Sequence, residues 1–129
     1  MEKQFEESMV NVTLAGFYTM GDSAELHEDK YVIEKVSKVK EDTWKFEARI
    51  QYNKKDFKVA MPLPVKWAGD TPVISLTNFA VPGMGSFTAR VVFYNGAYAG
   101  TWSGAAGHGG KLFGKISKNA AVAPAPTVP

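Results

Sequence analysis

The sequence contains no cysteine and only two histidines, His27 and His108. The missing cysteine excludes disulfides, thiolate metal sites and a cysteine nucleophile. Two histidines far apart in the sequence form no metal-ligating pattern, so we expect no metal and no other cofactor. Acidic residues are scarce after Glu47, where only Asp56 and Asp70 follow, both in predicted turns. No carboxylate pair suited to glycoside chemistry can therefore be identified.

The sequence also lacks a long apolar run. None approaches the roughly 20 residues of a membrane-spanning helix, so no membrane association is expected. Residues 1–7 are acidic, whereas a signal peptide begins with basic residues followed by an apolar segment, so no signal peptide is expected. A cytoplasmic location and export after removal of a signal both stay open.

What the chain does contain is enough apolar material for one folded domain. Its 129 residues are 45% hydrophobic and 12% aromatic, which excludes a disordered chain. Residues 1–47 carry 6 Lys and 11 acidic residues, and residues 48–129 carry 9 Lys or Arg and 2 acidic residues. Since the basic residues alternate with apolar ones and do not cluster, mutual neutralisation within one domain is favoured over a nucleic-acid partner.

Apolar and polar residues alternate with a period of two from Val10 to Ser117, which predicts an all-β protein. The first hairpin is predicted from strands Thr43–Tyr52 and 57–67, joined by the turn Asn53–Asp56. Pairing Tyr52 with Phe57 places the apolar side chains of both strands on one face.

Two prolines, Pro62 and Pro64, fall on the outward side of the second strand. Proline cannot donate to a ladder, so this half of the strand is predicted to be an edge or a bulge.

The second hairpin is predicted from strands 86–94 and 97–103, with Asn95-Gly96 as a type I′ turn that sets Tyr94 opposite Ala97. Further strands are predicted at 10–18, at 31–39 with a bulge near Glu34 and Lys35, at 72–77 and at 111–117. The polar segment 21–30 is interpreted as a loop or one helical turn, in which His27, Glu25, Glu28 and Asp29 are solvated.

About eight antiparallel strands in a meander predict a small up-and-down β-barrel, with a two-sheet β-sandwich as the alternative. Glycines 16, 100 and 114 within strands suit the tight bends of a small barrel. The expected organisation is a flexible N-terminus at 1–9, a single barrel domain at 10–118 and a flexible Ala/Pro-rich tail at 119–129.

The aromatic residues of the strands fall on predicted inward faces, where they either fill a core or line a pocket. The candidate ligand-binding residues are Trp44, Phe46, Trp67, Phe93, Tyr98 and Trp102, with His108 at the mouth of the barrel.

No catalytic motif accompanies these residues. The segment Gly107–Gly110 lacks the Lys-Ser/Thr ending of a phosphate-binding loop, and Ser103 is not in a Gly-x-Ser-x-Gly elbow. An enzymatic hypothesis would use His108 as a base with Arg90 or a tyrosine as its partner, but no catalytic residue can be assigned.

Two segments share a pattern: Ala15-Gly16-Phe17-Tyr18-Thr19 and Ala99-Gly100-Thr101-Trp102-Ser103 both read Ala-Gly-x-aromatic-hydroxyl. The Gly-x-aromatic element resembles the Gly-x-Trp start of lipocalin and avidin barrels, which are calycin-like, and the resemblance implies a small β-barrel. Segments 67–77 and 87–114 also resemble a group of uncharacterised bacterial proteins, which implies no activity.

The sequence thus predicts a non-enzymatic small β-barrel that binds an apolar or aromatic small ligand. The alternative is a structural or interaction module with a solid core, whose Pro-rich edge strand 61–67 recruits a protein partner or a second copy in a homo-oligomer.

Overall fold

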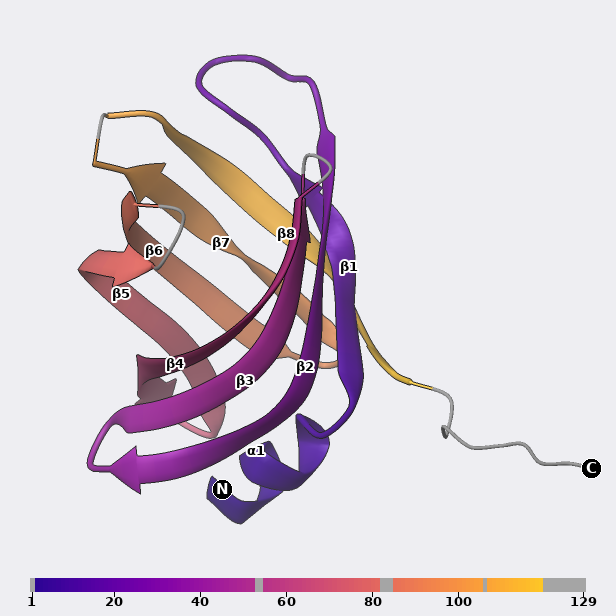
Figure 1. Ribbon diagram of the computed structural model, residues 1–129, viewed down its shortest axis with the longest axis vertical. Helices are drawn as coiled ribbons and strands as arrows, with labels where there is room; N and C mark the ends of the chain where they lie inside the picture. The colour runs from indigo at the N-terminus through magenta and orange to yellow at the C-terminus, as the bar shows by residue number, and fades with distance from the viewer. Residues whose placement is uncertain (1, 53–54, 82–84, 106, 120–129) are drawn as a thin grey trace, which may run out of the picture.

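The computed structural model describes residues 2–52, 55–81, 85–105 and 107–119 as one short helix and eight β-strands (Figure 1). The helix is α1 (Glu2–Ser8), and the strands are β1 (Val12–Tyr18), β2 (His27–Lys40), β3 (Thr43–Tyr52), β4 (Lys55–Ala68), β5 (Thr71–Val81), β6 (Gly85–Tyr94), β7 (Ala97–Gly104) and β8 (Gly109–Lys118).

The strands form a closed antiparallel barrel in which each pairs with the next along the chain. The circle closes because β8 pairs with β1, with Val12 opposite Lys118 and Tyr18 opposite Leu112. Closure confirms the predicted meander barrel and not the sandwich. It also gives every strand two neighbours, although β4 and β5 pair over only four residues each.

The β6–β7 hairpin confirms its predicted register. Tyr94 pairs with Ala97, and Phe93 pairs with Tyr98. Asn95 and Gly96 between them have φ angles of 55° and 73°, the positive values that a type I′ turn needs. A turn motif with one strong backbone preference is what fixed this register.

The β3–β4 hairpin is shifted by two residues from the predicted pairing. Tyr52 pairs with Lys55 and Ile50 pairs with Phe57, whereas the sequence analysis set Tyr52 against Phe57. A shift of two leaves the same side chains on the inward face. The hydrophobic pattern therefore cannot distinguish the two registers.

In β2 the predicted bulge is confirmed, since the register with β3 shifts between Ile33 and Lys35. The strand begins at His27, four residues before the predicted start at Tyr31. This earlier start brings Asp29 into the wall of the barrel.

Pro62 and Pro64 lie in a part of β4 that pairs with β3 alone among the described strands. The ladder between β4 and β5 covers only Val65–Ala68 and Thr71–Ile74, so the predicted edge character is confirmed. The Val65 N–H donates toward the β3 side, to the Asp42 carbonyl at 2.8 Å. Because backbone groups alternate in direction along a strand, positions 62 and 64 face away from β3, where a missing N–H costs nothing.

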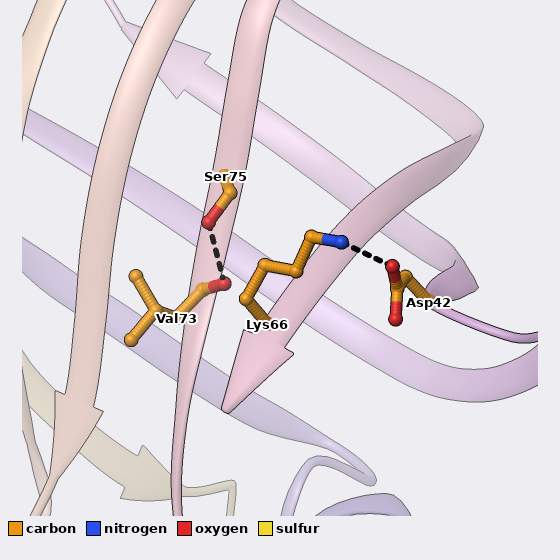
Figure 2. Close-up of polar contacts among 4 residues, drawn as sticks. All are labelled: Asp42, Lys66, Val73 and Ser75. Carbon is orange, nitrogen blue, oxygen red and sulfur yellow. Dashed lines mark hydrogen bonds and ion pairs between the residues drawn. The ribbon is translucent and has the colours of Figure 1, made fainter. Parts of the chain in front are cut away.

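Figure 2 shows the surroundings of this short ladder. Lys66 of β4 forms an ion pair with Asp42 in the β2–β3 connection, and the Ser75 hydroxyl donates to the Val73 carbonyl at 3.2 Å. Asp42 and Lys66 are both half-exposed or more, and pairs of this kind contribute little to stability.

Helix α1 closes one end of the barrel (Figure 1). Phe5 is 5% exposed and packs edge-on against Trp44 and Trp67, with ring centroids 5.0 and 5.7 Å apart. Residues 1–9 are predicted from the sequence to be a flexible N-terminus. Of these, Glu2–Ser8 form α1, and Phe5 and Met9 are buried in the core. No described helix is long and apolar enough to cross a membrane.

The last strand, β8, ends at Lys118. The Asn119 N–H donates to the Asn11 carbonyl at 2.8 Å. The rest of the predicted tail, residues 120–129, lies outside the described residues.

Candidate functional site

The barrel contains a partly open cavity of about 650 Å³ that extends toward the end opposite α1. Its wall is formed mainly by apolar side chains from every strand of the barrel. The apolar lining includes Leu14, Ile33, Phe46, Ala48, Ile50, Met61, Leu63, Ile74, Leu76, Phe87, Ala89, Val91, Phe93 and Leu112. A volume of this size falls within the range of small-molecule sites in proteins.

Five of the seven residues predicted from the sequence lie in the wall of this cavity. They are Phe46, Phe93, Tyr98, Trp102 and His108. Trp44 and Trp67 are not among the described lining residues. They pack against Phe5 at the closed end instead. The indole nitrogen of Trp44 is buried there without a hydrogen-bond partner in the described residues.

A hydrogen bond to the backbone holds the Trp102 side chain in place in the cavity wall. Its indole N–H donates to the Thr19 carbonyl at 3.1 Å, and its ring contacts Tyr18 and Phe87 with centroids 6.1 and 6.2 Å apart. This bond orders the chain just beyond β1. The indole therefore presents a fixed aromatic surface to the cavity.

His108 is exposed on the connection between β7 and β8, where it borders the cavity. Arg90, its partner in the enzymatic hypothesis, is not a lining residue. The Arg90 guanidinium donates instead to the Leu76 carbonyl at 2.6 Å and to the Thr77 hydroxyl at 3.1 Å. The structure does not bring these two side chains together in one site.

The sequence analysis missed the polar centre of the cavity, which is Asp29. It is 6% exposed and lines the cavity from β2. Tyr31 donates to its Oδ2 at 2.9 Å, and Tyr98 donates to its Oδ1 at 3.4 Å. The interpretation of this segment as a solvated loop is wrong for Asp29, because β2 begins at His27 and turns alternate side chains inward.

Tyr98 reaches Asp29 across two neighbouring strands that carry glycine. In the strand registers, Tyr98 pairs with Gly114, Gly114 with Gly16, and Gly16 with Asp29. A Cβ atom on either glycine would lie 2.7 Å from the Tyr98 hydroxyl. The absence of side chains at these two glycines therefore leaves room for the Tyr98 phenol.

Burial has the largest effect on the pKa of Asp29. Desolvation raises the pKa of Asp29 above its ordinary value of 3.8, and the hydrogen bonds from Tyr31 and Tyr98 oppose that change. Burial and the nearby carboxylate raise the pKa of both phenols. Both tyrosines therefore stay protonated and serve as donors.

Replacing Asp29 with asparagine is expected to stabilise the protein at neutral pH. Because the pKa of Asp29 is raised in the folded chain, the folded chain holds this proton more tightly than the unfolded chain does. The resulting contribution to stability is complete below about pH 4, and it is lost as the pH rises through the folded-state pKa. Asparagine does not titrate, so the variant does not lose stability in this way as the pH rises.

Urea unfolding of the unmodified chain and of Asp29→Asn, from about pH 4 to about pH 8, measures the effect. As the pH rises, the free energy of unfolding of the variant minus that of the unmodified chain should increase. A difference that stays constant over this range would show that Asp29 does not titrate differently in the folded and unfolded chains.

Among the described residues, no group of three or more His, Asp or Glu side chains is placed to hold a metal ion. Comparison of the chain with protein families, curated proteins and solved structures found no matching family, protein or structure. The function therefore has to be argued from the cavity itself.

Proposed function

We propose that this protein binds one small apolar or aromatic molecule inside its barrel. The cavity of about 650 Å³ is the observation that carries the proposal. Eight-stranded barrels are just wide enough either to be filled by side chains or to hold one small ligand. The closed antiparallel meander is compatible with a calycin-like barrel, and the proposal includes that likeness.

The alternative, an interaction module with a solid core, requires side chains that fill the interior. At one end of the barrel, Phe5 packs against Trp44 and Trp67. The rings of Trp102 and of Phe93, which also contacts Phe5, border open volume. This open volume favours a ligand site over a filled core.

In the proposed site, the apolar wall contributes affinity and the rim controls access. Transfer of apolar surface from water into the barrel contributes roughly 25 cal/mol per Å² of area buried. His108 and Met20 border the cavity near the end that lies opposite α1, and both are exposed. We assign His108 to the mouth of the site and give it no catalytic role.

Placing an aromatic ring inside the cavity is expected to weaken binding without unfolding the barrel. Ala48 is buried on β3 and lines the cavity, so Ala48→Phe places a ring in the space meant for the ligand. We expect the affinity for the neutral fluorescent probe N-phenylnaphthylamine to fall at least about tenfold, because loss of contacts worth about 1.4 kcal/mol gives a factor of ten.

The matched control is Ala60→Phe, because Ala60 is an exposed residue on β4. This variant adds the same ring on the outside of the barrel and should bind the probe as the unmodified chain does. Equal affinities for all three proteins would place the probe outside the cavity and contradict the proposal.

A further inference from the structure

Few polar side chains line the cavity, and the formal charge of the described lining is negative. Among the described lining residues, Asp29 is the one carboxylate, and neither Lys nor Arg is present. Asp29 forms no ion pair with a basic side chain in the described part of the chain. The cavity therefore holds a buried acid that has no cationic partner among the described residues.

A buried carboxylate normally needs a cation and several hydrogen bonds to offset its desolvation. The two partners of Asp29 are neutral phenols, and each donates one hydrogen bond. A carboxylate has about four lone-pair positions, so the described residues leave about two of them for a further donor. These open positions are on Asp29, whose side chain is part of the cavity wall.

The two phenols also hold the carboxylate in a fixed orientation. Tyr31 donates to one oxygen and Tyr98 donates to the other. The Tyr98 ring occupies the space above Gly16 and Gly114, where side chains would block it. Glycine at both positions therefore leaves room for the phenol of Tyr98, which makes the second hydrogen bond to Asp29.

The aromatic surroundings of Asp29 fit a cation as well. Tyr18, Tyr31 and Tyr98 all line the cavity, and the hydroxyl groups of Tyr31 and Tyr98 donate to the carboxylate. An ammonium group is attracted to the faces of aromatic rings. A carboxylate on a ligand would instead be repelled by Asp29.

We propose that the natural ligand is an apolar or aromatic amine, whose protonated nitrogen binds Asp29 while its hydrocarbon part fills the cavity. This inference rests on the proposed function and names the chemical class of ligand for that site. The ammonium donates to the open positions of the carboxylate and supplies the positive charge that the described residues do not. The rings of Phe46 and Phe93 contact the apolar part.

The test compares three probes that share one aromatic body and differ in their polar group: naphthylethylamine, naphthylethanol and naphthylacetate. Calorimetric titration into the full chain at neutral pH should give an affinity for the amine at least about tenfold higher than that for the acetate. Asp29→Asn should weaken binding of the amine by about 10- to 100-fold, the effect of losing a charged hydrogen bond. Binding of naphthylethanol should change less than about threefold.

The control variant is Asp42→Asn, which makes the same substitution at a half-exposed carboxylate near the closed end (Figure 2). Its affinities for all three probes should equal those of the unmodified chain. If Asp29→Asn fails to fold, the ratio of amine to acetate affinity in the unmodified chain decides the question alone.

The outcomes separate the two proposals. If all three probes bind the unmodified chain equally well, or if Asp29→Asn leaves the amine affinity unchanged, the assignment of an amine is overturned and the ligand site stands. If none of the probes binds, the proposed function fails, and the assignment of an amine fails with it.

Discussion

Replacing Gly16 with alanine is expected to lower the free energy of unfolding by about 3 kcal/mol, the upper part of the range for overpacked positions. The new Cβ would collide with the backbone carbonyl of Phe113 and would lie 2.6 Å from the Cα of Gly114. Neither backbone atom can move without opening the β1–β8 ladder that closes the barrel. The same atom would press on the Tyr98 hydroxyl and displace it from Asp29.

The matched control is Gly104→Ala on β7. The nearest atoms to a Cβ at that position lie 3.8 Å away, an ordinary contact distance. Urea unfolding should therefore find Gly104→Ala as stable as the unmodified chain to within about 0.5 kcal/mol. If Gly16→Ala is equally well tolerated, the close approach of β1 to β8 and to Tyr98 is not a feature of the folded protein.

Replacing Phe5 with alanine is expected to cost about 3 kcal/mol, since truncation of a buried phenylalanine removes apolar contacts and leaves a cavity. Phe5 is the residue of α1 that reaches the core, where it contacts Trp44, Trp67 and two further aromatic rings. Urea unfolding followed by tryptophan fluorescence measures the loss.

Gln4→Ala is the control for this substitution, because Gln4 is an exposed residue of the same helix. It should change the free energy of unfolding by less than about 0.5 kcal/mol. Equal unfolding midpoints for Phe5→Ala and Gln4→Ala would show that α1 does not contribute to the closed end of the barrel.

The sequence predicts the strands and the barrel well because both depend on a local period of two. The β6–β7 register is also predictable, since Asn95-Gly96 has one strongly preferred turn. The β3–β4 register is not, since a shift of two keeps the same face buried. Helix α1 spans only seven residues, too few to show a helical period, and it is ordered by contacts distant in sequence.

The site was partly predictable for a related reason. Alternation shows that Trp44, Phe46 and Phe93 point inward, but it does not show that Phe5 of α1 packs against them or that Phe46 and Phe93 also border open volume. Both features depend on where Phe5 inserts. Asp29 was missed because its segment is polar, although its spacing from Tyr31 and Ile33 was the signal that placed it on the inward face.

The cavity as a ligand site is most directly tested by calorimetric titration of N-phenylnaphthylamine into the unmodified chain and into Ala48→Phe. The account predicts saturable binding of one molecule per chain with a negative change in heat capacity, the mark of apolar surface buried on binding. It predicts that Ala48→Phe weakens this binding at least about tenfold. Absence of saturable binding to the unmodified chain, or equal binding to Ala48→Phe, would contradict it.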